Sequence, residues 1–561
     1  MLVGDPVAAA ALGRTFQVRA LFSKYENVKE SIISDYIASI PEGFSEAVEK
    51  VAAFQSGTMG TDFVLSNRAK MQMLVEKFHR EAGTLTPGIS KILGLLNDPR
   101  TIFFVSVHQP NLFPYGGVFK KIVLLQTLKR ALEERKTDVR IINFFLIVDH
   151  DFMDDLYIRM AELPSIRHSN GRLELRIPLN ESKRWQLVCN APLPGRTVFD
   201  GWRSQIYSWI RNSSSSLRTS TDKSAVMDNF EHFWRLAEQS YSRSKSYSDF
   251  NSFLISQLVN MEWGYDTLFV RLSEMSPVFE DGFNYLICNF GRYSAMLNET
   301  EKMFLRCGID TGVSPTSYLN APLWLHCSCG SKGSARVQSD RQGQMLLVGN
   351  CISCKRELNV VLGKHGRMMI PTERLSDLSP RAIPILLLLS RDLGVTCYAS
   401  GTGGSTGYSL VGLMLFKEFS LRMPTTVVWT SRDVYRGIGQ AESLEILRVS
   451  SESDITNYIN ILKQREFEYK NKIDPLITKR TRLVKNAGSI DLVLSNIFKI
   501  KQEQRKIREL LRMAEKVKKA IETKASIIDY VINFGIANTE ILWRRHLLEN
   551  DNLAAPLVMP L

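Results

Sequence analysis

The stretch that decides the fold is IFFVSVHQPNLFPYGGVFKKIVLLQTLKRALEERKTDVRIINFFLIVDHD, residues 102–151. An apolar run at 102–107 leads into a turn rich in proline and glycine, and apolar residues then recur at helical spacing over 118–136. A second apolar run fills 140–148. Both runs are continuous instead of alternating, which is typical of parallel strands covered on both faces. We therefore expect a strand–helix–strand unit over 102–148.

The same pattern returns later in the chain. There we expect, in order, a helix at 379–394 that ends at Gly394, a strand at 395–399, a glycine-rich turn at 400–407, a helix at 408–419 and a strand at 425–429. These segments predict an α/β fold with a Rossmann-like parallel-sheet core over 101–450. Residues 1–100 precede this core and are expected to be mostly helical and packed on it.

Three turns of this core carry polar or glycine residues directly after a predicted strand. Ligands of open parallel sheets bind beyond the carboxyl ends of the strands, so we expect the turns at 108–117, 149–151 and 400–407 to line one pocket. In the first turn His108, Gln109 and Asn111 offer hydrogen bonds to a substrate. Gly116 and Gly117 would let a ligand approach the amides at a helix start, although a well-made turn without a ligand explains them too.

The other two turns complete the candidate substrate site. Asp149 and Asp151 flank His150, and such neighbours favour an imidazolium suited to general acid–base catalysis. The alternative is an N-capping aspartate beside a surface histidine. In the third turn we expect the substrate to contact Ser400, Gly401, Thr402 and Gly403, and the backbone amides of 401–404 would face an anionic group.

Four of the eight cysteines form two close pairs, Cys327 with Cys329 and Cys351 with Cys354. Pairs separated by a hairpin-length segment indicate a zinc ribbon, in which four thiolates hold a structural zinc ion. His326 could replace Cys327 as a ligand, and disulfides are the competing interpretation. We expect a zinc-ribbon-like insertion over 322–360.

The C-terminal part has a different sequence pattern, with apolar residues at heptad spacing. Ile500, Ile507, Ala514 and Ile521 are spaced by sevens, and a turn near 486–489 separates two helical halves. This pattern predicts an antiparallel coiled coil over 453–530, followed by a tail at 531–561, and a homodimer formed through the coiled coil. Residues 461–530 hold 18 Lys and Arg against 9 Asp and Glu, out of a net charge of +13. A solvated helical face explains this excess, and binding to nucleic acid is the alternative.

The start of the chain has Asp5 and Pro6 where a secretory signal would have basic residues. The longest strongly apolar run, at 383–390, is too short to cross a bilayer. We therefore expect a cytoplasmic protein with no membrane partner.

The three turns resemble motifs of the bacillithiol biosynthesis cysteine-adding enzyme family, also called cysteine ligases. The family's Gly-Gln-Gln-Pro type motif is similar to the turn with Gln109 and Pro110, and its Asp-His-Asp motif is similar to 149–151. Its later glycine-rich motif is similar to YASGTGGSTGY at 398–408, and the order of the motifs agrees over roughly 100–525. A shorter stretch, HQPNLFPYGG, also resembles the WbqC-like family.

The first resemblance implies a ligase that joins the carboxyl of cysteine to the amine of a glucosaminyl-malate-like amino sugar. His150 with its flanking aspartates would then transfer protons, and Gln109 and Asn111 would hold a substrate. Whether a nucleotide such as ATP or ADP activates the carboxyl stays open, because the sequence contains no P-loop. The rival hypothesis is a nucleic-acid-associated protein with an inactive Rossmann-like core.

Overall fold

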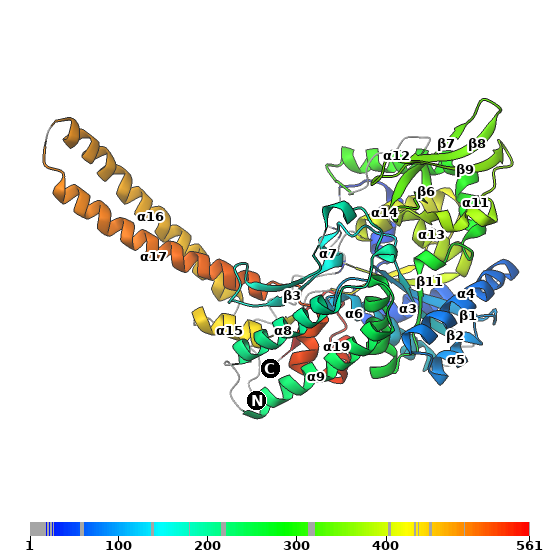
Figure 1. Ribbon diagram of the computed structural model, residues 1–561, viewed down its shortest axis with the longest axis horizontal. Helices are drawn as coiled ribbons and strands as arrows, with labels where there is room; N and C mark the ends of the chain where they lie inside the picture. The colour runs from blue at the N-terminus through cyan, green and yellow to red at the C-terminus, as the bar shows by residue number, and fades with distance from the viewer. Residues whose placement is uncertain are drawn as a thin grey trace.

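A computed structural model describes residues 27–559 except 56–60, 136–139, 179, 215–219, 312–319, 402–404, 431–432, 436, 448–451 and 487, and also describes residues 18, 22 and 25. Figure 1 shows a body with a central sheet, a second sheet on one side and a long pair of helices that extends away from the body. Among the described helices, none has the length and apolar character that a membrane crossing requires.

The central sheet has five parallel strands in the order β12-β11-β1-β2-β5. Their bounds are Thr101–His108 for β1, Arg140–Ile147 for β2, Leu268–Arg271 for β5, Val395–Ser400 for β11 and Thr425–Val428 for β12. Counted along the chain, this is the doubly wound order 3-2-1-4-5, which reverses direction between β1 and β11. The predicted α/β class and parallel sheet are confirmed.

The helices between the strands follow the predicted pattern. Helix α6 (Gly116–Glu133) joins β1 to β2 and is buried along most of its length. Helix α13 (Ala382–Leu393) ends at Gly394, whose φ of 69° is the left-handed conformation that favours glycine at a helix end. Helix α14 (Ser405–Glu418) then leads from β11 to β12.

The described residues of 27–100 are mostly helical and pack on the sheet and on α6 and α13. It consists of α2 (Ser31–Ser39), α3 (Phe44–Gln55), α4 (Asp62–Ala82) and α5 (Pro87–Leu93). A second group of elements is inserted between β2 and β5: α7 (Leu156–Arg159), the antiparallel pair β3 (Met160–Pro164) and β4 (Arg172–Arg176), η2 (Glu181–Lys183), η3 (Val188–Asn190), α8 (Arg196–Ser213), α9 (Ser220–Arg243), α10 (Tyr247–Ser256) and η5 (Gln257–Glu262).

The second sheet, called the ribbon sheet below, is inserted between β5 and β11. Its five antiparallel strands have the order β10-β6-β7-β8-β9. They span Asn320–His326 (β6), Lys332–Ser339 (β7), Gln344–Asn350 (β8), Glu357–Lys364 (β9) and Leu378–Pro380 (β10), and η6 (Leu272–Glu274), α11 (Glu280–Cys288), α12 (Phe290–Arg306) and η7 (Thr372–Asp377) accompany them. The ribbon sheet is therefore larger than the expected 322–360 insertion.

The long pair of helices consists of α16 (Glu452–Lys485) and α17 (Asp491–Ile521), called the helical hairpin below. Residues 463 and 466 of α16 pair with 515 and 508 of α17, so the two helices run antiparallel. Ile507, Ala514 and Val517 are buried between them and the body, whereas Leu510 is exposed. The hairpin is present, and its supercoiling stays a prediction.

The expected C-terminal tail is wrong. Helices α18 (Ile527–Phe534) and α19 (Ile536–Asn550) follow the hairpin and pack on α9 and α6, with Trp543 fully buried. Ser526 caps α18 by accepting a hydrogen bond from the amide of Ile528. The remaining elements are α15 (Ile438–Leu447) and the two-stranded sheet of β13 (Val434–Tyr435) and β14 (Val558–Met559).

Candidate functional site

The three predicted turns follow β1, β2 and β11, which are neighbours in the sheet and run in the same direction. Their carboxyl ends therefore lie at one edge, called the sheet edge below. A hydrogen bond of 2.5 Å from Gln109 Nε2 to Asp151 Oδ2 joins the first turn to the second. The sheet edge includes the reversal between β1 and β11, where doubly wound folds bind their ligands.

His108 ends β1 and is held as a neutral ring. Its Nδ1 lies 3.0 Å from the carbonyl oxygen of Gln109, so this nitrogen donates. Its Nε2 lies 3.4 Å from the hydroxyl of Tyr115 and accepts. Burial, together with the nearby charge of Lys121, lowers the pKa of His108 to about 3. The ring is therefore neutral near pH 7.

Asn111 and the two glycines are also at this turn, and all three are buried. Among the described residues, Asn111 Oδ1 has no hydrogen-bond partner. A Cβ added to Gly116 would lie 2.7 Å from the ring of Tyr530, and its amide donates to the carbonyl of Ala525. The C-terminal segment therefore makes the close contact with Gly116. The interpretation of this glycine as part of an anion-binding site did not anticipate that contact.

Asp149 is a buried structural acid. Its carboxylate accepts bonds from the amide of Ser273 (3.0 Å), the hydroxyl of Ser273 (2.7 Å) and the hydroxyl of Ser248 (3.3 Å). Burial raises its pKa to about 6, although the two hydrogen bonds from Ser273 and the charge of Arg271 act in the opposite direction. These bonds link the second turn to η6 and α10, and they use the carboxylate that we expected to act on His150.

His150 is buried, and its side chain faces the ribbon sheet. Its ring centroid lies 4.6 Å from that of His326. Burial first, and then His326 and Lys332, lower the pKa of His150 well below its usual value. The expected imidazolium is therefore wrong, because desolvation exceeds the effect of the neighbouring aspartates. Among the described residues, His150 Nδ1 has no hydrogen-bond partner.

The ribbon sheet brings two further residues to the sheet edge: Lys332, which no sequence pattern singled out, and His326, which was expected only as an alternative zinc ligand. Lys332 donates from Nζ to the carbonyl oxygen of His150 and lies 4.8 Å from the ring centre of Phe152 and 4.6 Å from that of Trp324. Burial lowers its pKa to about 8. The Nε2 atom of His326 lies 2.8 Å from the hydroxyl of Ser379. The only signal in the sequence was their position beside the first cysteine pair.

The third turn is described in part. Ser400 is buried and its hydroxyl donates to the carbonyl of Gly401 at 3.3 Å. Thr402 and Gly403 lie outside the described residues. The expected contact of this turn with Gln109 and His150 therefore stays a prediction.

The four cysteines form a compact cluster. The sulfur atoms of Cys327 and Cys354 lie 3.6 Å apart, those of Cys329 and Cys351 lie 3.5 Å apart, and all four lie within 4.8 Å of one another. A tetrahedral ion with sulfur ligands at about 2.3 Å spaces them by about 3.8 Å, so the cluster can hold one metal ion.

The turns that carry the cysteines support this arrangement. The first turn closes with a bond from the amide of Gly330 to the carbonyl of Cys327 at 2.9 Å, and the φ of Gly330 is 86°. The second turn has Lys355 at a φ of 62°. His326, the alternative ligand, points to His150 and Ser379 instead of the cluster.

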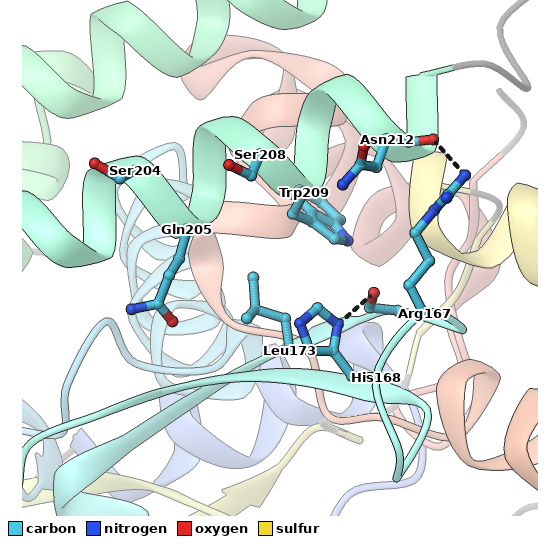
Figure 2. A pocket seen from close by; sticks show the side chains of 9 residues that line it. Arg167, His168, Leu173, Ser204, Gln205, Ser208, Trp209 and Asn212 are labelled. Carbon is cyan, nitrogen blue, oxygen red and sulfur yellow. Dashed lines mark hydrogen bonds between the residues drawn. The ribbon is translucent and has the colours of Figure 1, made fainter.

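A cavity of about 310 Å³ lies away from the sheet edge, between the β3–β4 turn and α8. Figure 2 shows Trp209 and the polar side chains of α8 on one wall and His168 and Leu173 on the other. Arg167 donates to the carbonyl of Asn212 at 3.1 Å and His168 Nδ1 lies 2.8 Å from the Ser165 hydroxyl. None of the described residues of the three predicted turns lines this cavity.

No family model and no curated protein matches the chain. A solved structure from Campylobacter jejuni, described as a "putative arginyl t-RNA synthetase", aligns over 84% of this chain and 98% of its own. The identity is 11% and the TM-score is 0.22, so this match carries no argument about fold or function.

Proposed function

We propose that the sheet edge is the active site of an enzyme that forms an amide bond between small polar substrates. The proposed reaction is that of the cysteine-adding enzymes, whose motifs the turns at 108–117, 149–151 and 398–408 resemble. The bond from Gln109 to Asp151 is the observation that carries the proposal, because it joins two of these motifs beside the point where the strand order reverses.

His150 is the proposed general base. Amide formation makes a C–N bond between the acceptor amine and the activated carboxyl of cysteine, breaks the C–O bond to the leaving group and releases a proton from nitrogen. A neutral imidazole can take this proton, and burial holds His150 neutral. The Nδ1 atom of His150 has no hydrogen-bond partner among the described residues. In the tautomer whose proton is on Nε2, Nδ1 is the atom that accepts the proton from the amine.

Gln109 and Asn111 are proposed to hold a substrate. The amide of Gln109 is fixed by Asp151, which leaves its oxygen as an acceptor for an amine or a hydroxyl. Asn111 Oδ1 is buried without a partner among the described residues, and such an atom gains most from a ligand that donates to it.

We further propose that the four cysteines bind zinc. Four thiolates in two close pairs are the usual donor set of a closed structural zinc site, which has no open position for a substrate. Zinc would hold the two turns of the ribbon sheet together. Metal analysis of the purified protein should give about one zinc ion per chain.

The reaction is tested by incubating the purified chain with cysteine and glucosaminyl malate, with and without ATP. Mass spectrometry should detect a product whose mass is the sum of the two substrates less one water. The two nucleotide conditions show whether ATP activates the carboxyl. Absence of this product under both conditions would reject the cysteine-adding reaction, and retention of nuclease-sensitive material by the same preparation would favour the nucleic-acid hypothesis.

A further inference from the structure

Two side chains of the ribbon sheet contact His150, one at its imidazole ring and the other at its backbone carbonyl. His326 is the last residue of β6, Lys332 is the first residue of β7, and the two are directly paired across the strands. His326 contacts the ring of His150, and Lys332 binds its backbone carbonyl. The turn between these two residues contains Cys327 and Cys329. The first metal-binding turn is therefore flanked by both contacts to His150.

A second connection runs through the segment at 187–190. Its amides donate to the second turn of the sheet edge, from Val188 to the carbonyl of Asp151 (2.9 Å) and from Cys189 to that of Asp149 (2.8 Å). The same segment binds the first cysteine turn, because Leu187 donates to the carbonyl of Gly330 at 2.9 Å. Two independent routes thus join the cysteine cluster to the residues around His150.

Lys332 is an unusual choice if its role is packing alone. Its side chain is almost fully buried, and no carboxylate of the described residues lies within ion-pairing distance of it. The charge of Asp151 raises the pKa of Lys332, but burial lowers this pKa further. Asp151, two aromatic faces and one carbonyl therefore offset only part of the cost of burying the ammonium group. A methionine of similar length would fill the same space without the charge. The retained charge therefore indicates a role at the sheet edge.

We propose that Lys332 is a positioning residue that makes the conformation of the His150 turn depend on the metal in the cysteine cluster. With the metal bound, the first cysteine turn fixes the register of His326 and Lys332, and their two contacts hold His150 in place. Without it, the turn between them loses its closure and both contacts loosen. The inference rests on the proposed metal binding, and it does not require the amide-forming reaction.

Hydrogen exchange of the full-length protein tests the dependence on metal. After zinc has been removed with a chelator and its loss confirmed by metal analysis, amides at 148–153 should exchange at least about tenfold faster, while β1 at 101–107 keeps its protection. Adding one equivalent of zinc should restore protection. Exchange that increases only within 320–364, or that increases equally in β1, would overturn the proposal.

Substitution of Lys332 tests its part in the connection with zinc still bound. Lys332→Met should speed exchange at 148–153 in the zinc-loaded protein, and Lys364→Met, an exposed lysine at the end of β9, is the matched control. By NMR, Lys332→Met should also raise the pKa of the His150 imidazole, because the Lys332 charge helps to lower it. Unchanged exchange and an unchanged His150 pKa in Lys332→Met would contradict the assignment.

Discussion

Two ion pairs of equal length, one in the body and one in the helical hairpin, differ in their exposure to solvent. Lys120 Nζ and Asp433 Oδ1 lie 2.6 Å apart in the body, and Arg508 Nε and Glu466 Oε1 lie 2.6 Å apart in the hairpin. The side chains of the first pair are 1% and 0% exposed, and those of the second are 52% and 29% exposed. The two pairs therefore have the same distance between their charged atoms and differ in the exposure of those atoms to solvent.

The surroundings of the buried pair show what this difference means. Asp433 also accepts hydrogen bonds from Tyr530 (3.2 Å) and Trp543 (2.9 Å), and Lys120 lies 4.2 Å from the ring centre of Trp429. These contacts join α6 to the C-terminal helices. In the hairpin, water screens each charge, so its many charged residues contribute little to folding and remain available for solubility or a partner.

Asp433→Asn should give the largest loss of stability. It leaves the Lys120 ammonium buried without its carboxylate, and removal of one partner from a buried pair costs about 3 to 5 kcal/mol. Urea denaturation followed by circular dichroism measures the change. A loss below about 1 kcal/mol, the range of exposed pairs, would mean that water reaches Lys120 and that the contrast between the two regions is wrong.

Lys121→Met should raise stability at pH 7, because Lys121 is buried and, among the described residues, its ammonium donates only to the carbonyl of Val107. Burial lowers its pKa from 10.5 to about 8, so the folded protein binds fewer protons than the unfolded chain between these values. Wild-type stability therefore rises with pH over this range. We expect a gain of about 1 to 3 kcal/mol at pH 7 that shrinks toward pH 10.5. Urea titrations at both pH values check this, and a loss at pH 7 would contradict it.

Phe498→Glu should weaken the proposed homodimer without unfolding the hairpin. Phe498 is 70% exposed and lines a shallow surface hollow of α17 with Leu494 and Lys501. An exposed apolar patch of this kind indicates an interaction surface, and we propose a second copy of the chain as its partner. Sedimentation should show a dimer dissociation constant raised at least about tenfold, which equals about 1.4 kcal/mol. A monomeric wild type would reject the dimer.

The heptad pattern also suggests charged substitutions at Ile507 and Ile521, but these are less suitable for this test. Ile507 is buried inside the helical hairpin, so a charge there would separate the two helices before it affected a partner.

Glu466→Gln should have the smallest effect. It removes the exposed pair with Arg508, and such pairs contribute about 0 to 1 kcal/mol. The same urea titration as for Asp433→Asn measures it, and added salt should reduce the difference further. A loss comparable to that of Asp433→Asn would show that solvent exposure does not separate the two regions.

The sequence predicted the elements whose signals are local. The continuous apolar runs predicted β1, β2 and β11, and Gly394 predicted the end of α13. The four-residue strand β5 was missed because so short an apolar run has no distinct pattern. Helices α18 and α19 were taken for a tail, although Ser526 was a readable cap.

The candidate site could be predicted only where its residues follow a strand. Gln109 and Asp151 were found in this way, and their contact follows from parallel pairing. The predicted environment of His150 was wrong because the residues next to it in the sequence are not the ones that surround its ring in space. Lys332 is separated from it by 182 residues and arrives through the folding of the ribbon sheet. No periodicity in a single sequence encodes such a contact.

The most direct test of the proposed active site compares two histidine variants in the amide-forming assay. His150→Gln removes the proposed base, and His168→Gln removes an exposed histidine that lines the separate cavity. The account predicts that His150→Gln lowers kcat by about 10²- to 10⁴-fold while the protein stays folded, and that His168→Gln keeps wild-type turnover. Equal turnover of the two variants, or loss only in His168→Gln, would contradict the sheet edge as the active site.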